Sequence, residues 1–390
     1  MRSAQHIRIV GLLSLCMFLI GEHKATGKEA DTISVQQHVQ VDSLQEAMKH
    51  YSWGKGHERN EMYEDAVEQY KKAISYDPNN PKMHYALGSV YYKMKRMQEA
   101  KASYLATTRA DSTHLNAHYM LAKIYHAEAN YDSALVQYEK TVTLKPDYVE
   151  IRRSVAELYR YRGREDDALR AYMELSQYVK DDPEIFALIG SLLQKAERTE
   201  EALAAYLRAW TLRPDDMATL ETIARLQLQI EDPEEALKSY WILAEHDTTN
   251  HAFLVKIVEL ADKLERTDDL IRGLERLTLL RSEDAVPVMK LAQIHFDAGR
   301  FDQAKKWIDR GLALTPQSGR LRALNGDYYL KVGNRRALAL KQFEWARADP
   351  VWKTYAEQRI ASIQYEISEE KRQREEAKKK AFFDRGKKGK

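Results

Sequence analysis

The chain has 390 residues, of which 44% are hydrophobic and 31% charged, so it can bury an apolar core behind a charged surface. Only 16 glycines and 9 prolines are present, which argues against an all-β or low-complexity chain.

Residues 1–27 are typical of an export signal. Arg2 and Arg8 precede a mostly apolar run from Ile9 to Gly21, and Ala25-Thr26-Gly27 offers the small residues that a signal peptidase reads. The run has 13 residues, fewer than the roughly 20 that span a bilayer. Cleavage is therefore favoured over an uncleaved anchor, and we expect an exported protein, periplasmic or secreted.

Residues 28–46 are polar and weakly patterned, which predicts a leader into the first folded unit. The only cysteine, Cys16, lies inside the signal segment, so a chain cleaved after Gly27 has no thiol chemistry. The absence of cysteine and of any Asn-x-Ser/Thr site after residue 27 favours a bacterial exported protein.

A 34-residue period runs from Ala47 to Pro350 and divides this stretch into nine units. At the eighth position eight of the nine units carry Gly or Ala, as in Gly54, Gly88 and Gly190. The twenty-fourth position is tyrosine in the first six units. In the ninth unit the pattern is displaced by one residue, to Ala339 and Phe343.

This pattern resembles the tetratricopeptide repeat family over residues 47–350. Leu87-Gly88, Tyr91, Ala100 and Tyr104 occupy the family's marker positions in the unit from Pro81 to His114. The resemblance implies an all-α superhelical solenoid of antiparallel helix pairs, which binds a protein or peptide along the first helices.

The residues inside one unit predict two helices, over 82–94 and 98–110. Small residues at positions eight and twenty allow the two helices to approach closely, and we expect the tyrosine at position twenty-four to fill space against the next unit. Prolines near the unit ends, such as Pro78 and Pro146, are expected to stop each second helix. Because no unit buries its apolar face alone, stacking makes one continuous core.

Two further segments follow the repeats. Trp352, Ala356, Ile360, Ile363 and Ile367 lie on one helical stripe, which predicts a capping helix over 351–370. Residues 371–390 contain ten basic and three acidic residues, which predicts a basic disordered tail. Residues 28–370 carry 48 basic and 55 acidic residues, so the tail is a candidate arm for an anionic membrane surface. Because export separates the protein from nucleic acid, we expect no nucleic-acid partner.

No catalytic constellation, phosphate loop or metal site is evident, and we predict a binding protein that is not an enzyme and needs no cofactor. His50, His84 and His118 recur 34 residues apart, but neighbouring helices lie about 8–10 Å apart, which is too far for one zinc ion to be shared. We interpret these histidines as packing residues.

The family resemblance places positions five, nine and twelve of each first helix in a concave groove. In the first units these positions hold an aromatic row with cations beside it, which suits an extended segment with apolar and acidic side chains. The candidate binding residues are Tyr51, Lys55, Tyr85, Tyr92, Tyr119, Lys123, His126 and Arg153.

The last three units predict a different surface, because Val255, Met289, Phe296, Ala323 and Leu330 make this end of the groove apolar. We hypothesise a scaffold or adaptor for a protein partner within an envelope assembly. Two alternatives stay open: a structural protein that self-associates, and a membrane-surface tether that acts through the basic tail.

Overall fold

The computed structural model describes the backbone of residues 27–387 and side chains between residues 40 and 381. The predicted export signal, residues 1–27, therefore lies outside the described residues apart from Gly27. Residues 27–387 contain 19 helices and no strand, which confirms the all-α fold class. None of these helices combines the length and the apolar character that a bilayer span needs.

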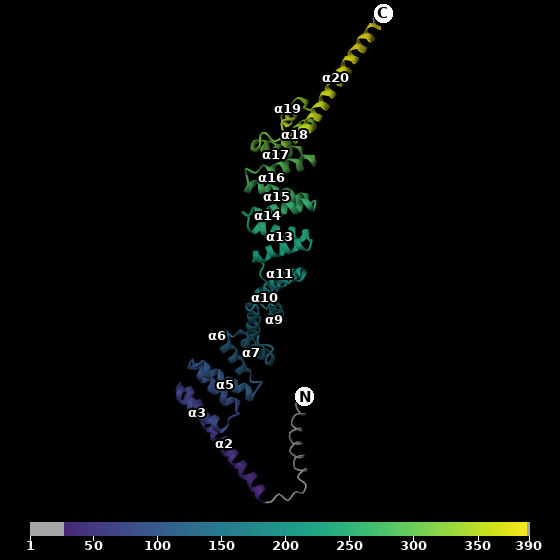
Figure 1. The fold of residues 1–390 in the computed structure, drawn as a ribbon. Helices are drawn as coiled ribbons and strands as arrows, with labels where there is room; N and C mark the ends of the chain where they lie inside the picture. Colours follow the sequence, from purple (N-terminus) through teal and green to yellow (C-terminus); the bar gives the residue numbers. More distant parts are fainter. Residues whose placement is uncertain (1–26, 388–390) are drawn as a thin grey trace, which may run out of the picture. The chain divides into compact units, whose positions relative to one another are not determined.

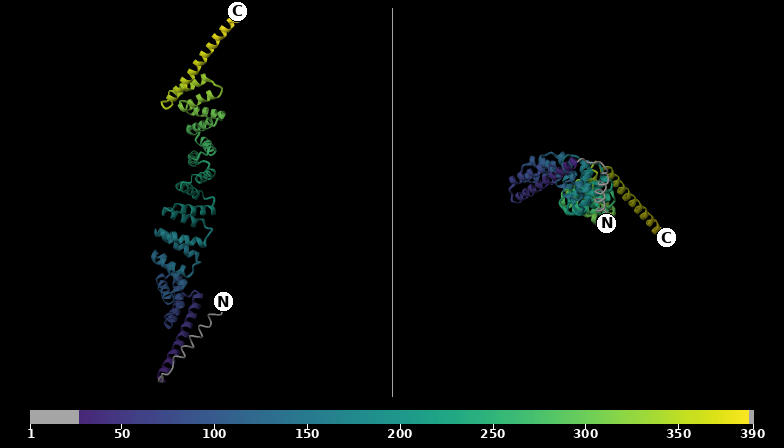
Figure 2. Two further views of the ribbon diagram at one scale, coloured as in Figure 1. Left: turned by 90° about the vertical axis from the view of Figure 1, so that its right-hand side faces the viewer. Right: turned by 90° about the horizontal axis from the view of Figure 1, so that it is seen from below.

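By its internal contacts the chain divides into two compact units, residues up to Lys180 and residues from Asp181 onward. In each of them helix pairs stack one after another along the chain (Figures 1 and 2). The N-terminal unit holds α2 (Gly27–Arg59), α3 (Tyr63–Tyr76), α4 (Pro81–Lys93), α5 (Met97–Ala110), α6 (Leu115–Ala127), α7 (Tyr131–Leu144), α8 (Val149–Tyr161) and α9 (Glu165–Tyr178).

The C-terminal unit continues the same alternation and adds one long last helix. It holds α10 (Pro183–Lys195), α11 (Thr199–Leu212), α12 (Met217–Gln229), α13 (Pro233–His246), α14 (His251–Lys263), α15 (Thr267–Leu280), α16 (Ala285–Asp297), α17 (Phe301–Leu314), α18 (Gly319–Lys331), α19 (Arg336–Ala346) and α20 (Lys353–Lys387). The helices α4 and α5 begin and end within a residue of the windows predicted from the sequence.

The two helices of a repeat meet where a small residue faces an aromatic ring. A Cβ atom placed on Gly54 would lie 2.6 Å from Cδ1 of Tyr70, and one on Gly88 would lie 2.9 Å from Cδ1 of Tyr104. Both tyrosines are fully buried. The ring packs on the glycine of its own repeat, and Tyr70 also belongs to one buried cluster with Leu87 and Val90 of the next repeat, where the sequence predicted a contact.

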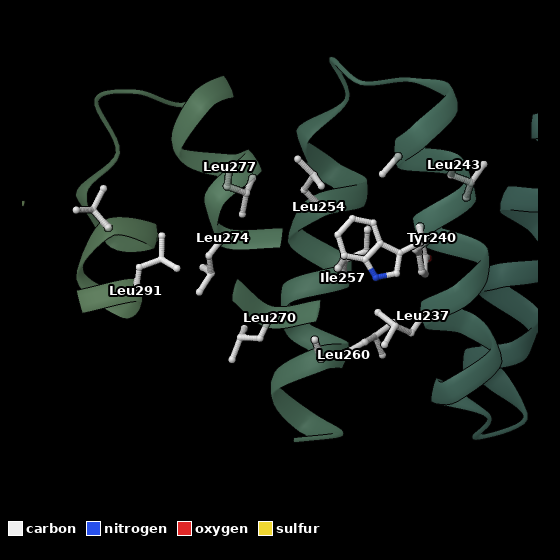
Figure 3. Close-up of a cluster of buried hydrophobic side chains, with 14 of the residues drawn as sticks. Leu237, Tyr240, Leu243, Leu254, Ile257, Leu260, Leu270, Leu274, Leu277 and Leu291 are labelled. Carbon is white, nitrogen blue, oxygen red and sulfur yellow. The ribbon is translucent and has the colours of Figure 1, made fainter. Parts of the chain in front are cut away.

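Contacts between successive repeats complete the core. In the C-terminal unit, leucines of α13, α14, α15 and α16 and Ile257 of α14 belong to one buried cluster and lie between the helices (Figure 3). Leu243, Leu254, Ile257, Leu277 and Leu291 are each at most 4% exposed. Neighbouring repeats therefore share a core, as the stacking argument predicted.

The one-residue displacement predicted for the ninth repeat is confirmed. A Cβ atom on Gly326 would lie 2.6 Å from Cζ of Phe343, and both Ala339 and Phe343 are fully buried. The extra residue lies in the turn between α18 and α19, where Gly333 and Asn334 both have positive φ. The inserted residue is thus absorbed by the turn, and the glycine–ring contact is kept.

The turns inside the repeats share a conformation that the sequence did not indicate. A residue with positive φ occurs every 34 residues, at 61, 95, 129, 163, 197, 231, 265, 299 and 333, and it is glycine in only three of the nine positions. Around Glu197, the N–H of Arg198 donates to the carbonyl of Leu193 at 3.0 Å, and the N–H of Glu197 donates to that of Gln194 at 3.1 Å. These bonds close the helix C-terminus in a Schellman motif.

The prolines prove unnecessary for ending the second helices. The helices α3, α5, α7, α9, α11, α13, α15 and α17 end at residues 34 apart. Pro78 and Pro146 follow α3 and α7 by two residues, but α9 ends at Tyr178 with no proline before Pro183. The packing of the repeat therefore determines where each second helix ends. A proline after that point is compatible with the helix end but is not required for it.

Both terminal segments are more helical than the sequence predicted. Residues 28–46 form one continuous helix with the first repeat in α2, and the hydroxyl of Ser43 donates to the carbonyl of Tyr76 at 2.8 Å. At the other end, Ala356, Ile360 and Ile363 of α20 are buried on α18 and α19. The helix then continues to Lys387, where a disordered tail was predicted from residue 371. Between 371 and 381 its side chains are exposed.

The glycine–ring contact predicts that a larger side chain at position 190 destabilises the fold more than a smaller one. A Cβ atom on Gly190 would lie 2.8 Å from Cδ2 of Tyr206. We expect Gly190→Phe to overpack this contact and lower the free energy of unfolding by about 1–3 kcal/mol. Gly190→Ala should cost less, since alanine fills this position in four other repeats. Gly56→Ala is the control, because no atom lies within 4 Å of its Cβ position. An unchanged melting curve for Gly190→Phe in circular dichroism would show that the helix register is wrong.

The left-handed turns predict a stabilising substitution. The left-handed conformation costs a non-glycine residue about 1–2 kcal/mol, and glycine loses about 0.5–1 kcal/mol through chain entropy. Glu197→Gly should therefore raise the free energy of unfolding by roughly 0.5–1 kcal/mol in urea titrations. Glu200→Gly, three residues away in the first turn of α11, should instead lower it by about 1 kcal/mol. Destabilisation by both substitutions would contradict the assigned turn.

Candidate functional site

The predicted aromatic row lies on the first helices of the N-terminal unit, in α2, α4 and α6. Its members, Tyr51, Tyr85 and Tyr119, are called the tyrosine row below, and each ring is half-buried. Tyr51 packs on Tyr70 with 5.7 Å between ring centroids, and Tyr85 packs on Tyr104 at 5.5 Å. One side of the Tyr51 ring and one side of the Tyr85 ring are therefore packed on a buried tyrosine. The rest of each of these two rings is partly exposed to solvent.

Two lysines lie over the faces of these rings. The Nζ atom of Lys55 is 5.8 Å from the ring centroid of Tyr51. The Nζ atom of Lys123 lies between two rings of successive repeats, 5.6 Å from Tyr119 and 5.9 Å from Tyr92. Both lysines are exposed, and neither makes an ion pair within the described residues. The row thus combines aromatic area with cations whose charge is not neutralised.

Glu58, the acidic residue at position twelve of the first repeat, already pairs with other groups. Glu58 pairs with Lys93 at 2.9 Å between Oε1 and Nζ, and its Oε2 accepts from the hydroxyl of Tyr70 at 2.8 Å. Burial and this carboxylate raise the pKa of Tyr70, and burial also raises the pKa of Tyr51 and of Tyr104. The phenols therefore stay protonated at neutral pH and act as neutral hydrogen-bond donors.

The structure adds aromatic rings that the sequence reasoning missed. His114 lies 4.7 Å from Tyr85, and Tyr148 lies 5.9 Å from Tyr119, measured between ring centroids. Both added residues are the last of a 34-residue unit and occupy the N-cap position of the next helix, where His114 accepts from the N–H of Ala117 and Tyr148 makes no side-chain cap hydrogen bond. An aromatic side chain at this position in two successive units was the sequence signal that could have found them.

The other predicted residues lie at the edge of this group. His126 is exposed and contacts Tyr131 and Tyr138, with ring centroids 5.6 and 6.4 Å apart. Arg153 is half-buried in α8 and does not belong to the lysine–tyrosine contacts. Of the eight predicted residues, the structure thus places Lys55 over the ring of Tyr51 and Lys123 over the rings of Tyr92 and Tyr119.

A cavity opens beside the first ring of the row. It measures about 350 Å³ and is lined by residues of α2, α4 and the loop before α4, among them Tyr51, Met48, Asn80 and Lys82. Its size falls within the range of small ligand pockets. The surface next to Tyr51 is therefore hollowed.

The three histidines with the 34-residue spacing make hydrogen bonds within their own repeat or to the end of the preceding one. His50 and His118 bond through Nδ1 to the side-chain oxygens of Gln69 and Gln137, both at 2.7 Å, and Nε2 of His84 bonds to the carbonyl of Pro78 at 2.8 Å. Among the residues with described side chains, no group of three metal-ligating residues comes together. The arrangement can bind through aromatic area, hydrogen bonds and cations.

Two family models match parts of the chain. The one described as "TPR repeat" matches residues 60–95, and the one described as "Tetratricopeptide repeat" matches residues 81–114, 115–148, 183–216 and 288–318. Three of these matches cover one unit of the 34-residue period from its first residue to its last. No curated protein sequence matches the chain.

Several solved structures are similar to parts of the chain. A crystal structure of MamA protein is 20% identical and covers 43% of this chain and 92% of that one, with a TM-score of 0.36. YrrB, described as a TPR protein with an unusual peptide-binding site, is 21% identical and covers 49% and 96%, with a TM-score of 0.36. A tetratricopeptide repeat protein from Parabacteroides merdae is 16% identical and covers 64% and 98%, with a TM-score of 0.32.

Proposed function

Since this chain belongs to the tetratricopeptide repeat family, we propose that it is a scaffold that holds a protein partner on the tyrosine row of its N-terminal unit. The observation that carries this proposal is the pairing of exposed lysines with half-buried tyrosines in repeats one and three, without a carboxylate to neutralise them. Such a surface is suited to binding a partner through aromatic contacts and positive charge. It offers no nucleophile with an adjacent base.

The chemistry of the row selects the kind of partner. Rigid tyrosine faces give contact area at a low cost in side-chain entropy, and they suit apolar side chains. Lys55 and Lys123 are free to make charge-assisted hydrogen bonds with carboxylates. The best match is an extended segment that alternates apolar and acidic side chains and crosses successive first helices.

Two sets of substitutions test this binding surface. The triple variant Tyr51→Ala, Tyr85→Ala, Tyr119→Ala removes the rings, and the double variant Lys55→Glu, Lys123→Glu reverses the exposed charges. We expect each variant to lose the partner crosslinked to the wild-type protein at least about tenfold. Tenfold corresponds to about 1.4 kcal/mol, which is comparable to the loss of one hydrogen bond to a charged group or the truncation of one aromatic anchor. Quantitative mass spectrometry of the crosslinked complexes measures the loss.

The matched control reverses the same charge elsewhere on the same unit. Lys71 of α3 and Lys140 of α7 are exposed on second helices, so Lys71→Glu, Lys140→Glu should keep the partner. Melting curves verify that each variant is folded. Capture of the same partners by all the folded variants would place the binding surface elsewhere and end the proposal for the tyrosine row.

The proposal also includes the cellular location of the protein. Export rests on the sequence of residues 1–27, and we propose that the protein works in the periplasm or outside the cell, in an envelope assembly. N-terminal sequencing of the protein recovered from cells is expected to begin after Gly27. A mature protein that starts at Met1 and stays in the cytoplasm would contradict export.

Two alternative functions, a membrane tether and a self-associating structural protein, are each supported by one observation. The exposed basic end of α20 favours a tether to an anionic membrane surface, since Lys and Arg near such a surface contribute about 1 kcal/mol each. Repeat arrays also expose their ends, which favours self-association. Liposome binding at two salt concentrations tests the first alternative, and light scattering at several protein concentrations tests the second.

A further inference from the structure

A cavity at the end of the C-terminal unit lies apart from the tyrosine row. It measures about 420 Å³ and is bounded by the first helices of the last two repeats, α16 and α18, and by α20. We call it the C-terminal pocket. Its lining residues are Gln293, Phe296, Asp297, Arg320, Ala323, Leu324, Asp327, Lys331, Trp352, Tyr355 and Arg359.

The floor and one wall of the C-terminal pocket are apolar. Ala323 and Leu324 of α18 are at most 6% exposed, and Phe296 of α16 and Trp352 before α20 are half-buried. The sequence predicted an apolar end of the groove from Phe296 and Ala323. The structure adds that α20 closes this end on one side, so that an open apolar face becomes a bounded pocket.

The wall that α20 provides is held in place by its own contacts. The hydroxyl of Tyr355 donates to Oδ2 of Asp327 at 2.6 Å, and Nη2 of Arg359 donates to Oδ1 at 2.7 Å. Arg336 of α19 pairs with Glu366 and Glu370 of α20 at 3.3 and 2.7 Å. These contacts fix the wall before any ligand arrives, which lowers the entropy cost of binding.

The two cations of α18 that line the C-terminal pocket make no ion pair within the described residues. The carboxylate of Asp327 is occupied by Tyr355 and Arg359, and that of Asp297 accepts from the amide of Gln293 at 2.9 Å. Arg320 and Lys331 are exposed and make no ion pair within the part of the chain that the structure describes. They lie on the same face of α18, eleven residues apart, so about 16 Å of helix separates them.

The guanidinium of Arg359 is only partly paired, through the contact of its Nη2 atom with Asp327. Its Nε atom is buried and has no hydrogen-bond partner within the described residues.

We propose that the C-terminal pocket is a second binding site, for a short polypeptide segment of a partner that carries an aromatic side chain next to carboxylates. The aromatic side chain occupies the apolar floor, and the carboxylates pair with Arg320 and Lys331. This site is independent of the tyrosine row, so the chain holds two different segments, one on each of its compact units.

A defined peptide tests the site on the full chain. The probe is the fluorescein-labelled nonapeptide Gly-Ser-Gly-Glu-Phe-Glu-Gly-Ser-Gly, and its binding is followed by fluorescence anisotropy. Arg320→Glu and Lys331→Glu change exposed side chains, so both variants should fold. We expect each to raise the Kd at least tenfold. The same loss is expected when the probe carries glutamine for both glutamates, or serine for phenylalanine.

Two controls separate this site from general charge attraction and from the tyrosine row. Lys353→Glu removes the same charge from the first residue of α20, outside the pocket lining, and should change the Kd less than twofold. Because Glu-Phe-Glu also alternates acidic and apolar side chains, each titration is repeated in the triple tyrosine-row variant, where Arg320→Glu and Lys331→Glu should still raise the Kd at least tenfold. Loss of the crosslinked partner in the triple variant, together with probe binding that Arg320→Glu still weakens there, would support both sites separately.

Three results would overturn the proposal. The first is no saturable binding of the probe up to about 1 mM, the weak end of specific affinities. The second is an equal loss of affinity in Arg320→Glu and Lys353→Glu, which would mean attraction by net charge alone. The third is self-association of the wild type that Arg320→Glu abolishes in light scattering, which would make a second copy of this chain the occupant.

Discussion

The close contact between a small residue and an aromatic ring fixes the geometry of each repeat. Where Gly54 meets Tyr70 and Gly88 meets Tyr104, even one added carbon would fall inside van der Waals distance of the ring. This contact sets how near the two helices of a pair lie, and hence where the apolar residues of the next pair must be. The ninth repeat shows how strongly it is maintained, because the inserted residue is taken up by the turn at Asn334 and Gly326 still faces Phe343.

Periodic features of the sequence predicted the fold well, whereas features without a residue preference did not. The glycine and tyrosine spacing located the helix pairs, and Ala339 with Phe343 located the displaced ninth repeat. The left-handed turns escaped notice, because Lys95 and Glu197 are not residues whose type indicates positive φ. The continuation of α20 was also missed, since a highly charged sequence with little apolar pattern reads as disordered even where the structure extends a helix that begins on a packed core.

The candidate site was predicted in part for the same reason. Tyr51, Tyr85 and Tyr119 repeat at one position, so the row followed from the period. The contact between the rings of His114 and Tyr85 depends on the distance between the end of one unit and its own first helix, which only the folded chain defines. The C-terminal pocket was still harder to foresee. Trp352, Ala356, Ile360 and Ile363 predicted one packed stripe, but Tyr355 and Arg359 lie on a neighbouring face of α20 that closes the pocket.

The length of α20 has a mechanical consequence. The helix is anchored through Ile363, and residues 371–387 extend its exposed part by about 25 Å at 1.5 Å a residue. A helix transmits force and orientation along its axis, whereas a flexible tail of the same composition would only tether. Whatever contacts the basic end of α20 is therefore kept at a set distance from the last repeat, and adding one helical turn would move it outward by about 5.4 Å. The number of residues in α20 thus sets how far its basic end lies from the last repeat.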